Sequence, residues 1–138
     1  MSPELENKLA SEFPFMRVEK RYKSGEFYGF GCECGDGWYQ LLHDLCRDIT
    51  NYFKDFGVSP EDIPLRPDQI KEKYGELRFY YSGDIPYEMD EGLYDIIYDY
   101  EKKSTETCER CGKPGKLRGG GWVMCLCDDC WAESQKGR

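Results

Sequence analysis

Two Cys-x-x-Cys pairs near the C-terminus constrain this chain more than any other feature. Cys108 and Cys111 form the first pair, Cys127 and Cys130 form the second, and fifteen residues separate the pairs. Each pair can turn two sulfurs toward one point, so this spacing is typical of a tetrahedral zinc site with four thiolates. Free thiols or redox pairs are the alternative. Because four thiolates leave no position open for water, we expect one structural Zn²⁺ that takes no part in catalysis.

The segment that carries these pairs, residues 105–138, is too short to bury a core, so we expect the metal to fold it. Gly112 suits a tight turn after the first pair, and residues 115–121 can form the turn of a hairpin between the pairs. Trp122 would then cover the metal from the return strand, and Trp131 could begin a helical turn. This order predicts a treble-clef-like unit, with a plain zinc ribbon as the alternative.

Four further cysteines lie outside the two pairs: Cys32, Cys34, Cys46 and Cys125. Cys32, Cys34 and Cys46, together with His43 or Cys125, could form a second metal site. The helix that we expect over residues 38–56 would point His43 away from its apolar face, which argues against that site. Free cysteines more often serve as small buried hydrophobic residues, and we expect that role for these four.

Catalytic chemistry has little to draw on in this sequence. His43 is the only histidine, and no Cys–His or Ser–His catalytic pair can be built without it. On the outer face of a helix we expect it to be exposed and inert. We therefore expect a binding protein, with no catalytic residues.

Charge divides the chain into two parts. Residues 1–101 contain 11 Lys or Arg and 22 Asp or Glu, a net charge of −11, whereas residues 102–138 contain 8 and 5, a net charge of +3. We therefore expect an acidic domain over residues 1–104 and a mildly basic zinc-binding unit over residues 105–138. An acidic body repels nucleic acid and favours basic protein partners.

The sequence also indicates a compartment. The longest apolar runs are only a few residues, so no membrane span is expected. The acidic start Met1–Glu6 lacks the apolar stretch of a signal peptide. Eight cysteines in such a chain favour metal ligation over disulfides, so we expect a reducing cytoplasm.

Hydrophobic patterns over the first 104 residues predict an α+β fold. Ser2 and Pro3 are typical of a helix start, and residues 15–34 resemble a hairpin with its turn at Ser24–Gly25. Residues 38–56 repeat apolar side chains at helical spacing, and Gly57 suits the end of that helix. Between this strand and this helix, residues 35–37 should break the strand and cap the helix.

The second half of the domain shows a strand pair and another helix. Residues 77–81 alternate as a strand does, and residues 70–74 can pair with them through a turn near Gly75. Asp84 should cap a helix that has Pro86 in its first turn and runs to about Lys103. The predicted architecture is two main helices packed on a small antiparallel sheet, followed by the zinc unit.

This second helix has three faces. Its apolar residues form one arc, an acidic stripe forms the second face and tyrosines form the third. Asp84 to Glu101 include seven acids and no base. A solvated helix surface explains the acids. A recognition surface is the sharper hypothesis, because tyrosine gives rigid contact area and carboxylates spaced by four residues could imitate a phosphate backbone. The candidate partner-binding residues are Tyr87, Glu88, Glu91, Tyr94, Asp95, Tyr98 and Asp99.

Basic residues support an alternative function in nucleic-acid binding. In the zinc unit the candidates are Arg110, Lys113, Lys116 and Arg118. Basic and aromatic residues also interleave over residues 71–81, a pattern that can bind single strands, although a structural hairpin explains it as well.

Several segments together resemble a group of small bacteriophage and prophage proteins with a C-terminal four-cysteine, zinc-ribbon-like segment. The residues that carry the resemblance are Gly35–Trp38, Ile70–Tyr81, Glu101, Ser104, Cys108 to Gly112 and Gly121 to Cys130. It covers roughly residues 34–130, and Cys125 departs from it, since threonine is typical there. The resemblance implies expression in a bacterial cytoplasm. With the acidic stripe, it leads us to expect a protein that engages or inhibits a host defence or nucleic-acid-handling factor.

Overall fold

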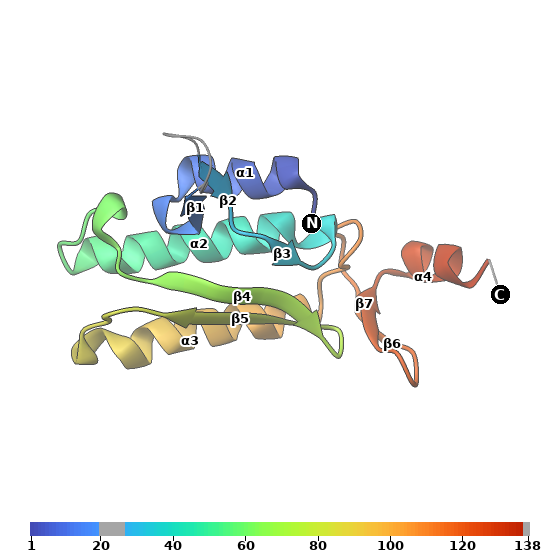
Figure 1. Ribbon diagram of the computed structural model, residues 1–138. Coiled ribbons are helices and arrows are strands. Elements are labelled where there is room, and N and C mark those ends of the chain that lie inside the picture. Colours follow the sequence, from blue (N-terminus) through green and yellow to red (C-terminus); the bar gives the residue numbers. More distant parts are fainter. Residues whose placement is uncertain (20–26, 137–138) are drawn as a thin grey trace.

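The structure is a computed structural model that describes residues 1–19 and 27–136. It is a mixed α/β molecule in which helix α2 lies between α1 and the strands β4 and β5, and the C-terminal elements stand at one end (Figure 1). The helices in the described ranges are α1 (Pro3–Glu12), α2 (Tyr39–Asp55), α3 (Tyr87–Ser104) and α4 (Asp128–Gln135). None of them is long and apolar enough to cross a membrane.

The N-terminal elements form as the sequence predicts, with one difference. Ser2 caps α1 by accepting the Leu5 N–H at 3.4 Å. Strand β1 (Arg17–Glu19) pairs antiparallel with β2 (Phe27–Gly29), while the predicted turn at Ser24–Gly25 lies outside the described residues. Asp36 does not cap the helix that follows it, because its carboxylate accepts the Ser2 N–H at 2.8 Å and so anchors the start of α1.

The main sheet is mixed, which corrects the prediction of an antiparallel sheet. Strand β4 (Arg66–Lys73) pairs antiparallel with β5 (Glu76–Ser82) through a two-residue turn, as predicted. On its other side β4 pairs in parallel with β3 (Cys32–Glu33). The order is therefore β3-β4-β5, and β3, which falls within the predicted hairpin of residues 15–34, belongs to a different sheet from β1 and β2.

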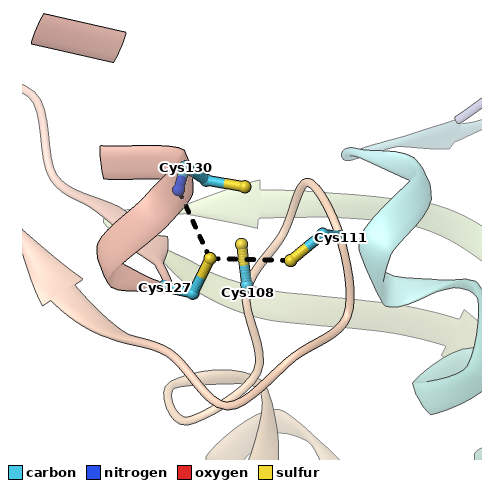
Figure 2. Close-up of side chains that lie close together, drawn as sticks. All are labelled: Cys108, Cys111, Cys127 and Cys130. Carbon is cyan, nitrogen blue, oxygen red and sulfur yellow. Dashed lines mark hydrogen bonds between the residues drawn. The ribbon is translucent and has the colours of Figure 1, made fainter. Parts of the chain in front are cut away.

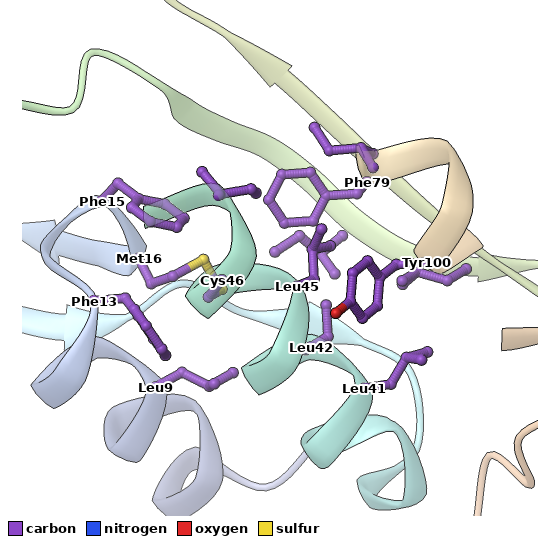
Figure 3. Close-up of a cluster of buried hydrophobic side chains, with 14 of the residues drawn as sticks. Leu9, Phe13, Phe15, Met16, Leu41, Leu42, Leu45, Cys46, Phe79 and Tyr100 are labelled. Atoms are coloured by element: carbon purple, nitrogen blue, oxygen red, sulfur yellow. The ribbon is translucent and has the colours of Figure 1, made fainter. Parts of the chain in front are cut away.

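Helix α2 forms the centre of the core. A short 3₁₀ turn (Asp36–Trp38) leads into it, and it ends before Gly57, whose φ is +82°. Its apolar residues share one buried cluster with residues of α1, the turn Pro14–Met16 and the sheet (Figure 3). The core residues labelled in that view are Leu9, Phe13, Phe15, Met16, Leu41, Leu42, Leu45, Cys46, Phe79 and Tyr100.

Helix α3 packs on α2 and along β5. It begins at Tyr87 with the extended Pro86 as its N-cap, so the prediction that Asp84 caps it was wrong. Near its end, Ser104 Oγ accepts the Leu77 N–H at 2.8 Å and Glu101 Oε2 accepts the Phe79 N–H at 2.9 Å. Since β5 is the outer strand, α3 satisfies backbone donors that the sheet leaves unpaired.

The C-terminal segment, here called the cysteine unit (residues 105–136), begins where α3 ends. It contains the antiparallel hairpin of β6 (Lys116–Arg118) and β7 (Met124–Leu126), followed by α4. The hairpin and the helix were predicted. The turn, however, spans residues 119–123, and Trp122 within it is 73% exposed and does not cover the cysteines.

Candidate metal centre and binding surfaces

The four cysteines of the two pairs come together at one end of the molecule. The sulfurs of Cys108, Cys111, Cys127 and Cys130 all lie within 4.8 Å of one another, and this is the one such group in the described residues (Figure 2). The sulfurs of Cys111 and Cys127 are 3.6 Å apart. In a tetrahedron with metal–sulfur bonds of about 2.3 Å, neighbouring sulfurs are about 3.8 Å apart. The cluster could therefore hold a metal ion with little rearrangement.

Local backbone structure aims the sulfurs. The first pair lies on a turn closed by the Gly112 N–H, which donates to Cys108 O at 2.9 Å. The second pair opens α4, where Cys127 is the N-cap and its sulfur accepts the Cys130 N–H at 3.4 Å. Two backbone turns, one before β6 and one after β7 in the sequence, thus present the four sulfurs to one another.

The electrostatics of the cluster favour a bound cation. Burial acts to raise the pKa of Cys108, but N–H donors from Cys127, Cys111 and Arg110 outweigh it and lower that pKa to about 6. Hydrogen bonding to the Cys127 sulfur, with burial, raises the pKa of Cys130 to about 12. The Cys108 thiolate therefore forms readily, whereas ionisation of Cys130 beside it is favoured by a positive ion.

The cysteine unit is seated on the loop that precedes α2. The Gly37 N–H donates to Glu109 O at 2.8 Å, and Trp38 Nε1 donates to Thr107 O at 2.8 Å. A Cβ on Gly37 would lie 2.3 Å from Cys108 O, so only glycine permits this approach. We call residues 35–38 the seat. From the sequence, residues 35–37 were expected only to break the strand and cap the helix, so their contact with the cysteine unit was missed.

Glu109 is the charged residue of this contact. Its side chain is 7% exposed, and Oε2 accepts the Gly35 N–H at 2.9 Å while Oε1 has no hydrogen-bond partner. Burial raises the pKa of Glu109, and the Gly35 N–H opposes that rise. The two glycines around Asp36 thus serve one purpose, which is to let the first cysteine pair pack directly on the backbone of the body.

A second contact joins the two parts of the chain. A Cβ on Gly75, at the tip of the β4–β5 hairpin, would lie 2.7 Å from Leu117 of β6 and 3.3 Å from the Cys125 nitrogen. Cys125 is fully buried and belongs to the main core, and its carbonyl accepts the Glu109 N–H at 2.9 Å. Cys125 is thus a packing residue between body and cysteine unit.

The other cysteines are also core residues, as expected. Cys32, Cys34 and Cys46 are buried in the main hydrophobic cluster. Burial raises the pKa of each thiol, to about 12 for Cys32. His43 does not join them. It is partly buried, contrary to expectation, with its ring 5.3 Å from that of Phe13 and Nε2 2.8 Å from Glu12 Oε2.

The tyrosine and acidic residues of α3 border a groove beside β5, which we call the tyrosine groove. One part is a hollow of about 490 Å³, lined by Tyr81, Tyr87, Glu88, Asp90, Glu91 and Tyr94. Tyr81 and Tyr94 continue into a second hollow of about 660 Å³, which Tyr98 also lines. The rings of Tyr94 and Tyr98 stack 6.0 Å apart.

Two predicted members of that surface, Asp95 and Asp99, are exposed on α3 but line neither hollow. Two residues that line the first hollow, Tyr81 and Asp90, were missed. Tyr81 lies in the predicted strand, and only the packing of α3 along β5 brings it to the groove. Burial and the nearby Asp90 carboxylate raise the pKa of Tyr81.

The basic residues of the cysteine unit do not form one free surface. Arg110, Lys113 and Lys116 are exposed, but Arg118 is engaged within the unit. Arg118 Nε donates to Leu126 O at 2.9 Å, its guanidinium pairs with Asp128, and it lies 5.9 Å from the Trp131 ring centre. Arg118 is therefore less available for the predicted nucleic-acid contact than the other three residues.

Comparisons of the chain with protein-family models, with curated proteins and with solved structures found no match. The structure itself offers three features on which a function can be argued: a cluster of four thiols, a groove of tyrosines and carboxylates, and a junction between the body and the cysteine unit.

Proposed function

We propose that the cysteine cluster holds one structural zinc ion and that the protein uses the tyrosine groove to bind a basic protein partner. Zinc fits the cluster because it favours four thiolates in a tetrahedron, and four sulfurs leave no position for a reactive water. The sequence of knuckle, hairpin and helix supports a treble-clef-like unit over a plain ribbon. In this proposal the metal shapes the molecule and the groove performs the binding.

The observation that carries the binding proposal is the lining of the groove. Three tyrosine rings and three carboxylates surround the first hollow, and no lysine or arginine is among its lining residues. Tyrosine rings attract cations through their faces, and carboxylates pair with them. A lysine- or arginine-rich protein surface complements such a groove in both shape and charge.

At one end of the groove the chain already contains this type of contact. Lys102 Nζ lies 5.0 Å from the centre of the Tyr98 ring and 3.2 Å from Glu76 Oε2. The Tyr98 ring stacks on Tyr94, which lines the first hollow. A partner's cation at Tyr94 would repeat, one helical turn away, the arrangement that Lys102 makes within the chain.

Net charge supports a protein partner over nucleic acid at the cysteine unit. Four thiolates around Zn²⁺ carry a formal charge of −2, which changes the net charge of residues 102–138 from +3 to +1. With Arg118 paired internally, the unit keeps little free positive charge. The nucleic-acid alternative at Arg110, Lys113 and Lys116 therefore receives less support than the groove.

If the protein acts in a phage-infected bacterial cytoplasm, as the resemblance implies, a host nucleic-acid-handling or defence enzyme is a fitting target. The positive cleft of such an enzyme normally holds a phosphate backbone. An acidic, tyrosine-rich groove would compete for that cleft by presenting carboxylates in place of phosphates.

Charge reversal tests the binding proposal. The triple variant Glu88→Lys, Asp90→Lys, Glu91→Lys should lose affinity by at least about tenfold, because these carboxylates line the first hollow and their reversal would repel a basic partner. The readout is capture of protein partners from nuclease-treated bacterial lysate, followed by titration calorimetry with the captured protein. The matched control reverses Glu4, Asp55 and Glu106, which are exposed and lie outside the groove. Equal affinity of both triple variants would sink the proposal.

A further inference from the structure

A second surface lies at the junction between the body and the cysteine unit. A cleft of about 310 Å³ lies between the end of β4 and the β6–β7 turn. Its lining residues are Lys71, Glu72, Lys73, Tyr74, Gly121, Trp122 and Val123. We call it the junction cleft, and it shares no lining residue with the tyrosine groove.

Two large aromatic side chains stand almost free of the protein at this cleft. Tyr74 is 72% exposed and Trp122 is 73% exposed, although they come from turns that are 48 positions apart in the sequence. The packing of Gly75 against Leu117 and Cys125 brings the two turns together. Neither ring contributes to a buried core, so core packing does not explain why aromatic residues occupy these positions.

The backbone conformation of Tyr74 also indicates a role for its ring. Tyr74 and Gly75 form the two-residue turn between β4 and β5, with φ of +54° and +78°. Turns with positive φ at both central residues favour Asn-Gly, Asp-Gly or Gly-Gly. Among the described residues Tyr74 is the only non-glycine with positive φ, a conformation that a bulky side chain adopts at an energetic cost. Tyr74 thus adopts a backbone conformation that costs energy without burying its ring, which indicates a role for the ring at the surface.

The charges around the two rings favour an anionic ligand. Lys71 and Lys73 line the cleft, and Lys73 Nζ lies 5.9 Å from the centre of the Tyr74 ring. The one carboxylate in the lining, Glu72, accepts the Gly75 N–H at 3.2 Å and so is used to close the turn. None of the seven acids between Asp84 and Glu101 lines the cleft, and salt screens their repulsion beyond about 10 Å at 0.1 M.

From these observations we propose that the junction cleft binds single-stranded nucleic acid, with bases stacked on Tyr74 and Trp122 and phosphates paired with Lys71 and Lys73. Exposed aromatic rings interleaved with lysines form the usual platform for unpaired bases, because every base offers a planar face. One wall of the cleft belongs to the cysteine unit, so the site is complete only when that unit is seated on the body. This surface is independent of the partner-binding groove.

The test is fluorescence anisotropy of a labelled 12-nucleotide mixed-sequence DNA strand with the metal-loaded full-length chain at 50 mM salt. Tyr74→Asn is the decisive variant, because asparagine suits a turn with positive φ and should leave the Tm unchanged or slightly higher. We expect it to weaken binding by at least about fivefold, which is the loss of one base stack. Trp122→Ala should give a similar loss, while Phe56→Ala, which removes a half-exposed ring at the end of α2, should give none.

The lysines have their own readout. Lys71→Gln and Lys73→Gln should each reduce the slope of log affinity against log salt by about 0.7, whereas Lys54→Gln on α2 should leave it unchanged. An unlabelled duplex of the same sequence should compete poorly, because its bases are not free to stack.

Three results would overturn the proposal: no binding of the single strand at 50 mM salt, equal affinity of wild type and Tyr74→Asn, or competition by the duplex as effective as that by the single strand. A polyglutamate peptide that binds with the same dependence on Tyr74 and Trp122, in the absence of DNA binding, would instead identify an acidic protein segment as the ligand. The groove variant with Glu88, Asp90 and Glu91 reversed separates the two surfaces, since its binding of the single strand should still depend on Tyr74 and Trp122.

Discussion

Gly37 shows how a single residue can determine the placement of a whole segment. It has no side chain to separate the seat from the first cysteine pair, and its N–H makes one of the hydrogen bonds between them. Gly120 and Gly121 of the β6–β7 turn have no such neighbours, in contrast to Gly119. A Cβ on Gly120, for example, would meet nothing within 4 Å.

We predict that Gly37→Ala destabilises the protein by about 2–3 kcal/mol, through the clash with Cys108 O and the strained or lost hydrogen bond to Glu109. Urea denaturation measures the change. Gly120→Ala is the matched control and should stay within about 0.5 kcal/mol of the wild type. Similar stability of the two variants would show that the seat contributes little to folding.

A second prediction concerns Ser104, which is fully buried. Its hydroxyl accepts the Leu77 N–H of the outer strand. Ser104→Ala leaves that donor without a partner in a site that water cannot reach, so we expect a loss of about 1–3 kcal/mol. Ser11→Ala removes a hydroxyl that bonds to the backbone at an exposed site and should cost far less. Equal losses in denaturation experiments would contradict this explanation.

At the scale of elements, the sequence predicted those helices and strands that local interactions determine. Apolar spacing together with Ser2 and Gly57 predicted α1 and α2, and alternation with Gly75 predicted the β4–β5 hairpin. The spacing of the cysteines predicted the cysteine cluster. The start of α3 was misplaced because the residue before a proline disfavours helical backbone. Ile85 therefore cannot continue a helix from Asp84, and the helix starts after Pro86.

The parallel pairing of β3 and the seat were beyond sequence reasoning for a different reason. Strand β3 has only two residues, too few to show an alternation. The partners of residues 35–38 lie about 70 positions away, and periodicity within a short window carries no information about them. The tyrosine groove was only half predicted, since its β5 side depends on how α3 packs.

The edge contact between α3 and β5 gives a prediction that depends on pH. Burial raises the pKa of Glu101, opposed by the Phe79 N–H that its carboxylate accepts. The folded chain thus holds the proton of the Glu101 carboxyl group more tightly than the unfolded chain does. Ionisation therefore costs stability as pH rises from the ordinary glutamate pKa through the raised one.

Glu101→Gln removes this ionisation but keeps an oxygen for the Phe79 N–H. The variant should therefore gain stability relative to the wild type between pH 4 and pH 7, as measured by urea denaturation at both values. Glu101→Ala lacks the acceptor and should be less stable than the glutamine variant at both. A difference between Glu101→Gln and wild type that stays constant with pH would contradict the assignment.

At the scale of the whole molecule, the cysteine cluster and the core are coupled. Trp38 of the body is fully buried and donates to Thr107 O of the cysteine unit, while Cys125 of that unit is fully buried in the main core. Loss of the metal should therefore loosen residues 105–136 and also lower the Tm of the entire chain, while α1 to α3 persist.

Cys111→Ser tests this coupling. We expect zinc content, measured by mass spectrometry of the purified protein, to fall from one per chain toward zero, with fast amide exchange over residues 105–136. Cys125→Thr removes a buried thiol that is not a ligand, so it should keep the metal. An unchanged zinc content in Cys111→Ser would refute the four-thiolate site.

The separation between the seat and its occupant has a consequence for how the chain is made. Gly35 and Glu109 are 74 positions apart, so during translation the seat is synthesised long before the first cysteine pair leaves the ribosome. Until then the glycine-rich loop, the buried face of Trp38 and the tip of the β4–β5 hairpin lack their cover. We expect metal capture to be the last step of biogenesis. Zinc-starved cells should accumulate completed chains in which this end is open. Proteases should degrade these chains faster than metal-loaded chains, so the half-life of the protein in cells should fall with the supply of the ion.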